Sequence, residues 1–273
     1  MTDYPTLALN DGRQLPQLGF GTWQIPEDDV AGIVRQALKT GYELVDTAAI
    51  YKNESGVGEG LSDAPDIFLQ TKIWNADQGY SQTKAAFAEA LDRLGRADVD
   101  MLLIHWPCPA NDKYVDTWKA MIELREAGKA KSIGVSNFRP EDLERLVNET
   151  GVTPALNQIE LHPGFQQREL CAVHDDMGIV TQSWSPLGQG QAMANGPIAG
   201  IARTLKAEPA AVVIAWHLHH GFAPLPKASS KEHMEANFTA LKLRLTDEQI
   251  AAIDALNDAD GRMGPDPDEF NLT

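Results

Sequence analysis

Four side chains with the chemistry of an acid–base site follow three consecutive apolar runs of the sequence. Asp46, Lys72 and His105 each stand at the end of such a run, and Tyr51 follows Asp46 by five residues. A free phenol has a pKa of about 10, which a nearby ammonium group lowers by stabilising the phenolate. A carboxylate can hold that ammonium in place, and a histidine can donate a hydrogen bond to a carbonyl oxygen. The set therefore fits proton transfer from Tyr51 to a carbonyl oxygen, coupled to a hydride that only a cofactor supplies.

The apolar runs belong to a regular alternation of short strands and amphipathic helices. The predicted strands are 19–22, 43–47, 66–73, 99–105, 132–135, 155–160, 179–184 and 222–225. The predicted helices are 28–40, 54–61, 81–94, 114–127, 140–149, 166–177, 198–206, 209–220, 230–241 and 246–257. A β-hairpin over residues 6–15 precedes them, with a tight type I′ turn at Asp11 and Gly12. Eight strands with intervening helices favour an α/β fold, a (β/α)8 TIM barrel with an N-terminal β-hairpin and extra helices, over an open sheet.

No linker rich in proline, glycine or serine divides the chain, so residues 1–273 are predicted to form a single barrel domain. The polar, proline-rich residues 258–273 are predicted to form an extended C-terminal tail. In this fold, polar side chains at the carboxyl ends of the strands converge on one face, which holds the active site. A lone strand-end Asp or Lys is more often half of a structural ion pair than a catalyst. Four such groups, flanked by Trp23, Trp74 and Trp106, favour a catalytic site.

The composition argues against several function classes. The formal net charge of −16 disfavours nucleic-acid binding, which needs a basic surface. No apolar run approaches about 18 residues and no signal peptide precedes the hairpin, so we expect no membrane segment and a cytoplasmic location. Cys108 and Cys171 are the only cysteines and are expected to be free thiols. The histidines at positions 217, 219 and 220 lack the spacing of a metal-binding motif, so no metal is expected.

Five ordered segments carry a resemblance to a known family. They are GYELVDTA at 41–48, TKIW at 71–74, LIHWP at 103–107, KSIGVSNF at 131–138 and NQIELHP at 157–163. From the hairpin to about Glu269, the chain resembles the aldo-keto reductases, and DTAAIY at 46–51 with PLGQG at 186–190 is similar to the bacterial 2,5-diketo-D-gluconic acid reductases. The resemblance implies an NADPH-dependent oxidoreductase that reduces aldehydes or ketones to alcohols, with keto-sugar acids such as 2,5-diketo-D-gluconate among the candidate substrates.

The resemblance also implies roles for individual residues. Tyr51 would be the general acid, Asp46 and Lys72 would tune it, and His105 would orient the substrate carbonyl. The residues implied in cofactor binding are Gly21, Thr22, Ser136, Asn137, Gln158, Trp184, Ser185, Leu187, Gly188, Gln189, Lys227, Ser229, Lys231, His233 and Asn237. Those implied in walling the substrate pocket are Trp23, Ile50, Trp74, His105 and Trp106. The loop 188–196 is interpreted as a flap over the cofactor pyrophosphate, and the family default is a monomer.

The stretch that would hold the adenosine end of the cofactor departs from the family pattern. Lys227 and Asn237 match that pattern. The replacements are Ala228 for a serine, His233 for an arginine and Ala236 for a glutamate. A 2′-phosphate is held best by fixed cationic donors, and a neutral histidine contributes little charge, although Ser229 and Lys231 can compensate. We therefore expect the preference for NADPH over NADH to be smaller than the family pattern implies, so that NADH is also usable.

Two rival functions remain open at the level of the sequence. In the first, Lys72 forms a Schiff base, as in an aldolase-type lyase on the same barrel. In the second, the chain binds a nucleotide without catalysis, as a sensor or a structural subunit. Borohydride trapping and NADPH turnover with a panel of carbonyl compounds distinguish both from a reductase.

Overall fold

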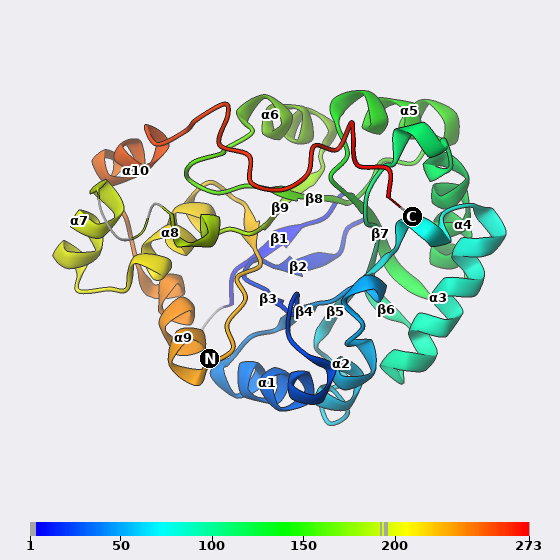
Figure 1. Cartoon of the computed structure of the whole chain (residues 1–273), viewed down its shortest axis with the longest axis horizontal. Coiled ribbons are helices and arrows are strands. Elements are labelled where there is room, and N and C mark those ends of the chain that lie inside the picture. The colour runs from blue at the N-terminus through cyan, green and yellow to red at the C-terminus, as the bar shows by residue number, and fades with distance from the viewer. Residues whose placement is uncertain (1–3, 192, 194–195, 273) are drawn as a thin grey trace.

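The computed structural model describes residues 4–191, 193 and 196–272 and shows parallel strands surrounded by helices (Figure 1). Each strand pairs with the next in the order β3 to β10. The strands are β3 (Phe20–Gly21), β4 (Leu44–Asp46), β5 (Phe68–Ile73), β6 (Val99–Ile104), β7 (Ala130–Ser136), β8 (Leu156–Glu160), β9 (Val180–Trp184) and β10 (Ala223–Pro224). The helices are α1 (Glu27–Thr40), α2 (Glu54–Gly60), α3 (Tyr80–Leu94), α4 (Tyr114–Glu126), α5 (Pro140–Thr150), α6 (Arg168–Met177), α7 (Gly196–Leu205), α8 (Pro209–His219), α9 (Lys231–Phe238) and α10 (Asp247–Asp254).

Backbone hydrogen bonds between the first and last strands of this sheet close it into a barrel. Gly19 N donates to Pro224 O at 3.1 Å, and Gly21 N donates to Pro226 O at 3.3 Å. Glycine permits this approach, because a Cβ atom on Gly19 would lie 2.3 Å from Leu225 Cδ2. The (β/α)8 TIM barrel predicted from the sequence is therefore confirmed.

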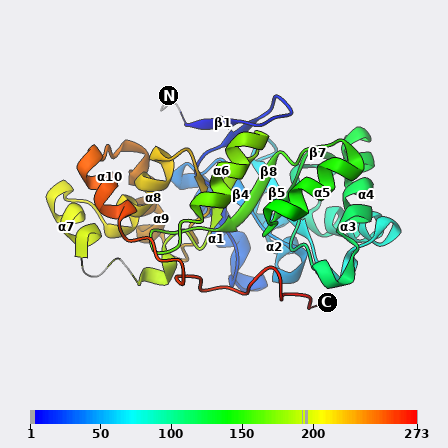
Figure 2. The same ribbon diagram turned by 90° about the horizontal axis from the view of Figure 1, so that it is seen from above.

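The inside of the barrel changes from apolar to polar along its axis. Leu44, Phe68 and Leu156, the first residues of three strands, pack in one cluster with Leu9 and Leu15 of the hairpin. The hairpin strands β1 (Thr6–Ala8) and β2 (Gln14–Pro16) lie at this end, opposite the C-terminal tail (Figure 2). Nearer the carboxyl ends, the buried side chains are polar: Asp46, Gln70, Lys72, Gln158 and Gln182. Buried polar groups need partners, so this layer has to be hydrogen bonded internally.

Three local expectations are corrected. The hairpin turn is not type I′, which needs two successive residues with positive φ, because Gly12 has a φ of 87° and Asp11 does not. The helix expected from residue 166 begins at Arg168, since Gln167 has a left-handed φ of 44°. The helix expected over 230–241 divides into α9 and the 3₁₀ segment Thr239–Lys242.

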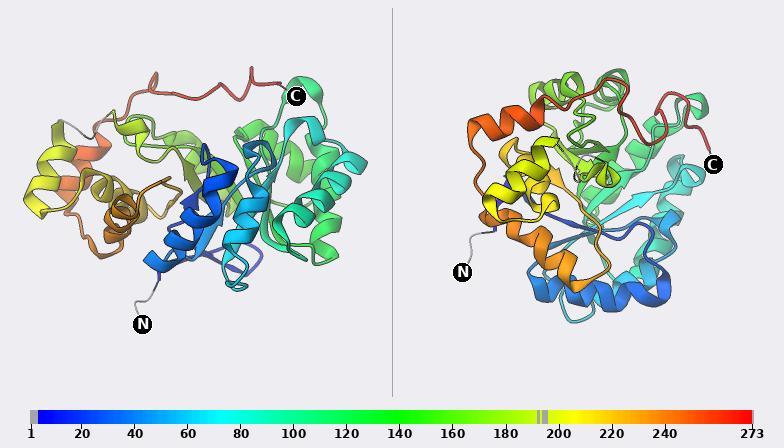
Figure 3. Two further views of the ribbon diagram at one scale, coloured as in Figure 1. Left: turned by 60° about the horizontal axis from the view of Figure 1, so that its bottom comes forward. Right: turned by 60° about the vertical axis from the view of Figure 1, so that its left-hand side comes forward.

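Residues 258–272 contain no helix or strand and run as a tail across the end of the barrel where the strands finish (Figure 3). This path brings the tail to the face on which the strand-end polar residues lie. Within the described ranges, no helix is long and apolar enough to cross a membrane.

Candidate active site

A buried ion pair joins two neighbouring strands. Lys72 Nζ, on β5, lies 2.6 and 2.7 Å from the two carboxylate oxygens of Asp46, the last residue of β4. The Lys72 side chain is fully buried and the Asp46 side chain is 5% exposed. Burial lowers the pKa of Lys72, and the Asp46 carboxylate opposes that effect by stabilising the ammonium. Because neither charge reaches bulk water, each depends on the other.

Tyr51 lies on the short 3₁₀ turn Ala49–Tyr51, close behind β4. Lys72 Nζ donates to the Tyr51 hydroxyl oxygen at 3.3 Å. Burial and the nearby Asp46 carboxylate raise the pKa of Tyr51 well above its ordinary value. The net direction is opposite to the lowering expected from Lys72, because burial and the Asp46 carboxylate both raise the pKa. At neutral pH the hydroxyl keeps its proton and can donate it.

Asn53 and Glu54 hold the segment that carries Tyr51. Thr47 Oγ1 donates to Asn53 Oδ1 at 2.8 Å, and Thr71 Oγ1 donates to Glu54 Oε1 at 2.6 Å. Both acceptors are almost completely buried. Since Thr47 follows β4 and Thr71 belongs to β5, these bonds tie the turn to the same two strands that supply the ion pair.

His105 follows β6 and borders the same space. Its ring centroid lies 5.8 Å from that of Tyr51 and 5.3 Å from that of Trp74. Burial and the Lys72 ammonium hold the pKa of His105 well below its ordinary value, so the imidazole is neutral. Its Nδ1 atom is buried and has no hydrogen-bond partner among the described residues. A neutral imidazole keeps one N–H, which can donate to a carbonyl oxygen beside Tyr51.

Three glutamine side chains complete the polar layer around Asp46. Gln70 Nε2 donates to Asp46 Oδ1 at 2.7 Å, and Gln158 Nε2 donates to the same oxygen at 3.2 Å. Both nitrogens also donate to Gln182 Oε1, at 2.7 and 2.8 Å. The sequence prediction identified Gln158 but missed Gln70 and Gln182. The available signal was a glutamine inside each of two apolar strand runs.

Ser136, Asn137 and Trp184 surround Gln158. Ser136 Oγ donates to Gln158 O at 2.8 Å. Asn137, which has a φ of 63°, donates through Nδ2 to His105 O at 3.0 Å. Trp184 Nε1 donates to Asn137 Oδ1 at 2.8 Å. These bonds join the ends of four successive strands, β6 to β9, so the residues predicted to bind a nicotinamide lie together next to His105.

The side chains predicted from the sequence to wall the mouth of a substrate pocket differ in their exposure and contacts. Trp23 is 49% exposed and Ile50 is 37% exposed. Trp74 and Trp106 pack against Phe270 of the tail, with ring centroids 6.4 and 4.4 Å apart respectively. The sequence prediction missed Phe270, although an aromatic residue within a polar tail was a usable signal.

Hydrogen bonds anchor the tail on both sides of this mouth. Met263 N and Gly264 N donate to the Glu160 carboxylate at 2.7 and 2.9 Å. Burial acts against the charged form, yet the hydrogen bonds to Glu160 hold its pKa below the ordinary value. Farther along, Asn75 Nδ2 donates to Leu272 O at 2.8 Å. The tail therefore connects the end of β8 with the segment after β5.

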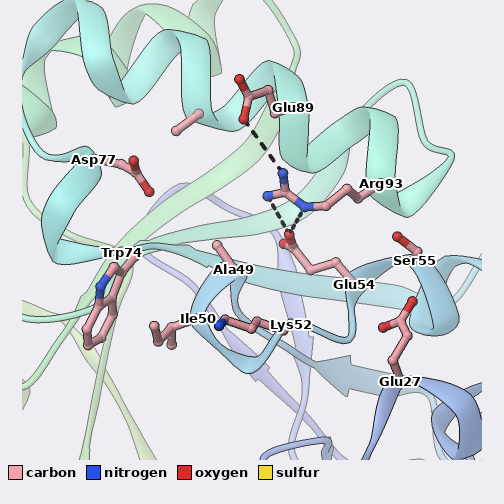
Figure 4. Close-up of a pocket in the computed structure, with 11 residues that line it drawn as sticks. Glu27, Ala49, Ile50, Lys52, Glu54, Ser55, Trp74, Asp77, Glu89 and Arg93 are labelled. Carbon is pink, nitrogen blue, oxygen red and sulfur yellow. Dashed lines mark hydrogen bonds and ion pairs between the residues drawn. The ribbon is translucent and has the colours of Figure 1, made fainter.

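A surface groove of about 420 Å³ lies beside the mouth and shares Ile50 and Trp74 with it (Figure 4). Inside the groove, Arg93 Nη2 lies 2.7 Å from Glu54 Oε2. Three further carboxylates line it: Glu27, Asp77 and Glu89. This excess of negative charge disfavours the phosphates of a nucleotide here. Among the residues that the structure describes, no group of three side chains is arranged to hold a metal ion.

Comparisons with known proteins agree with this geometry. A model of the aldo/keto reductase family matches residues 17–258. The chain belongs to the aldo/keto reductase family. The resemblance inferred from the sequence is thus confirmed. The chain is 47% identical over 273 residues to an aldo-keto reductase of Mycolicibacterium smegmatis, covering 98% of this chain and 99% of the relative.

Two further relatives of this aldo/keto reductase have a substrate or a cofactor in their descriptions. Methylglyoxal reductase DkgA of Escherichia coli K12 is 43% identical over 276 residues, covering 99% of each chain. The crystal structure of a Gox0644 mutant in complex with NADPH is similar with a TM-score of 0.96, at 46% identity, covering 97% of this chain and 98% of that one.

The residues of this aldo/keto reductase that are predicted to meet the adenosine end lie on α9 and just before it. Lys227, Ser229 and His233 are exposed, whereas Asn237 is buried. Lys231 Nζ lies 3.5 Å from Glu235 Oε1, and both side chains are more than half exposed. An ion pair this exposed contributes little to stability, so the Lys231 side chain is free to turn toward a phosphate.

The remaining predicted cofactor residues stand at the ends of two strands. They are Gly21 and Thr22 at β3, and Ser185, Leu187, Gly188 and Gln189 after β9. Thr22 is fully buried and its hydroxyl donates to Asp46 O at 2.9 Å, so its side chain is engaged inside the barrel. Ser185 and Gln189 have left-handed φ values of 48° and 49°. The interpreted flap over 188–196 includes residues 192, 194 and 195, which lie outside the described residues.

Proposed function

We propose that the chain reduces aldehydes or ketones to alcohols with NADPH as the hydride donor. The observation that carries this proposal is the linkage of Tyr51, Lys72 and Asp46, with a neutral His105 across the same space. Membership of the aldo/keto reductase family and the NADPH complex of Gox0644 support it. NADH is expected to serve less well, as argued from Lys231 and His233.

The proposed reaction uses each of the four side chains for one task. The substrate carbonyl oxygen accepts hydrogen bonds from Tyr51 and from the neutral His105. Bound NADPH supplies the hydride that reaches the carbonyl carbon. Tyr51 gives its proton to the oxygen, and the ammonium of Lys72, 3.3 Å away, stabilises the tyrosinate that remains. Asp46 keeps Lys72 charged and in position.

The residues around Gln158 fit a nicotinamide carboxamide. Gln158 is only 2% exposed. Its Oε1 atom has no hydrogen-bond partner in the described part of the chain, but this oxygen keeps some solvent-accessible surface. Ser136 and Asn137 add polar groups beside it, and Trp184 places an aromatic ring at the same point. Together they offer a hydrogen-bonding edge and a stacking surface for a planar amide-bearing ring.

The proposed substrates are small or polar carbonyl compounds. Methylglyoxal is the first candidate, because a relative of 43% identity is a methylglyoxal reductase. Keto-sugar acids such as 2,5-diketo-D-gluconate are the second, on the sequence resemblance alone. The tail with Phe270 lies against Trp74 and Trp106, which favours compact substrates. A cytoplasmic location and a monomeric state remain predictions from the sequence.

The Schiff-base alternative is disfavoured by the state of Lys72. Its Nζ atom already contacts both oxygens of Asp46, Thr47 O and the Tyr51 hydroxyl, and its side chain is fully buried. A lysine nucleophile needs a neutral amine with a free lone pair, whereas this site holds an ammonium.

A substrate panel tests the proposal. The purified chain is mixed with NADPH and with methylglyoxal, 2,5-diketo-D-gluconate or a simple aldehyde, and loss of NADPH absorbance is followed. We expect turnover with at least one of them and no adduct after borohydride treatment. Tight NADPH binding with no turnover on any carbonyl would instead support the sensor alternative, and a borohydride-trapped adduct at Lys72 the lyase.

A further inference from the structure

A closed ring of hydrogen bonds crosses the interior of the barrel. Its four members alternate between acceptor and donor: Asp46 Oδ1, Gln70 Nε2, Gln182 Oε1 and Gln158 Nε2, with successive separations of 2.7, 2.7, 2.8 and 3.2 Å. All four side chains are buried, and those of Gln70 and Gln182 have no exposed surface. The ring joins β4 and β5 on one side of the barrel to β8 and β9 on the other.

The charge of Asp46 determines the orientation of every amide in this ring. An ionised carboxylate only accepts hydrogen bonds, so Gln70 and Gln158 must each turn their NH₂ group toward it. Their second N–H groups then converge on one atom, which has to be the oxygen of Gln182. As a result, Gln70 Oε1 and Gln182 Nε2 are buried without partners in the described part of the chain.

Those two unpartnered atoms accompany the amide orientations that give the ring all four of its hydrogen bonds. If Gln70 and Gln182 both reversed their amides, Gln182 Nε2 could donate to Gln70 Oε1, but an amide oxygen would then face the Asp46 carboxylate. Gln182 Nε2 would also face Gln158 Nε2, so the reversed ring would keep two hydrogen bonds instead of four. The present arrangement is therefore favoured although two buried atoms stay unsatisfied. The ring therefore fixes the orientation of the Gln158 amide: its NH₂ group faces into the ring and its Oε1 atom faces away from it.

We propose that Gln70 and Gln182 are positioning residues that lock the Gln158 amide so that its oxygen accepts a hydrogen bond from the carboxamide N–H of the nicotinamide cofactor. This inference rests on the proposed NADPH-dependent function. The backbone of Gln158 is held separately, because Ser136 Oγ and Asn137 N donate to its carbonyl oxygen at 2.8 and 2.9 Å. With both parts immobilised, the acceptor is organised before the cofactor binds.

Binding of two cofactors tests this role. The first is NADPH, and the second is the reduced 3-acetylpyridine analogue of NADP, which keeps the carbonyl but has no amide N–H. The wild-type chain should bind the analogue about tenfold more weakly, the effect of one unpaired buried acceptor. In Gln182→Met, which keeps the side-chain length but removes the shared acceptor, Gln158 can rotate. The ratio of the two dissociation constants should then fall toward one.

Gln182→Glu is the matched conservative variant. A buried glutamic acid beside Asp46 keeps its proton, because a second carboxylate there would repel the first. Its carbonyl oxygen still accepts from both amides, and its hydroxyl replaces an NH₂ group that has no partner. We expect Gln182→Glu to keep the wild-type ratio while Gln182→Met loses it. A purely structural role predicts the opposite order, since methionine is easier to bury than glutamic acid.

Ser183→Ala, at the next position of β9, controls for disturbance of the strand, since Ser183 Oγ contacts His217 Nδ1 and not the ring. If Gln182→Met does not fold, Gln182→Leu removes the same acceptor and should give the same loss of discrimination. Gln70→Met leaves both partners of Gln158 Nε2 in place and should give a smaller loss. A wild-type ratio in every folded ring variant, or equal losses in Gln182→Met and Gln182→Glu, overturns the inference and leaves the proposed function intact. Failure of the wild-type chain to bind NADPH overturns both.

Discussion

The Tyr51 hydroxyl carries the proton that the proposed reaction consumes, and its only polar contact among the described residues is Lys72 Nζ at 3.3 Å. Replacement by phenylalanine removes the proton and leaves the ring in place. We expect Tyr51→Phe to reduce kcat by about 10² to 10⁴ fold, the range attributed to general acid catalysis, with NADPH affinity unchanged. Stopped-flow turnover and fluorescence titration of NADPH measure the two quantities. Near-normal turnover would refute Tyr51 as the acid.

The same hydroxyl predicts a pH profile. Reduction needs the protonated phenol, and burial with Asp46 raises the pKa of Tyr51 well above its ordinary value. The active form therefore persists below that pKa and is lost only as the pH rises through it. We expect kcat/KM for methylglyoxal to be level between about pH 6 and about pH 9. An alkaline decline centred near neutrality would show that Lys72, and not desolvation, dominates.

Among the elements, the C-terminal tail has the most direct influence on the mouth. The ring of Phe270 packs at a tilt against Trp106, with centroids 4.4 Å apart, and also contacts Trp74, which packs against His105. We predict that Phe270→Ala raises KM for methylglyoxal several-fold and raises kcat/KM for a bulky aromatic aldehyde relative to it. Leu272→Ala, at a side chain that is 66% exposed, is the matched control and should change neither value. An unchanged preference in Phe270→Ala would remove the tail from substrate selection.

For the whole molecule, three buried histidines make stability depend on pH: His105, His174 and His217. His174 Nε2 accepts from Asn157 Nδ2 at 2.8 Å and its Nδ1 contacts Thr181 Oγ1 at 2.8 Å, so a second ring proton would break one of these bonds. Burial lowers the pKa of His174 to about 4 and that of His217 to about 3. Below about pH 6.5 these histidines bind protons in the unfolded chain but stay neutral in the folded chain. The free energy of unfolding therefore falls as the pH is lowered.

The expected slope approaches about 1.4 kcal/mol per pH unit for each of the three histidines over this acidic range. Urea denaturation at several pH values between about 7 and about 5 measures it. His174→Gln should remove roughly a third of the histidine contribution, because His105 and His217 remain. If the slope of His174→Gln equals that of the wild type, His174 is not the residue that responds.

Much of this molecule was predictable from the sequence, because the relevant patterns are local. The alternation of strands and helices gave the barrel, and the position of Asp46, Lys72 and His105 at strand ends placed them on one face. Gln70, Gln182 and Phe270 escaped prediction because their partners lie on other strands or on the tail, far away in the sequence. The direction of the Tyr51 pKa also escaped, since desolvation depends on the assembled surroundings.

The seam between β3 and β10 has a consequence for the synthesis of the chain. Gly19 and Gly21 pair with the carbonyls of Pro224 and Pro226, which are synthesised about 200 residues later. Until then a nascent barrel has two open edges, and unpaired edges invite association with other chains. Closure is a contact between distant parts of the chain and is therefore slow. A ribosome-bound intermediate that lacks β10 would thus be the form of this protein that most needs a chaperone.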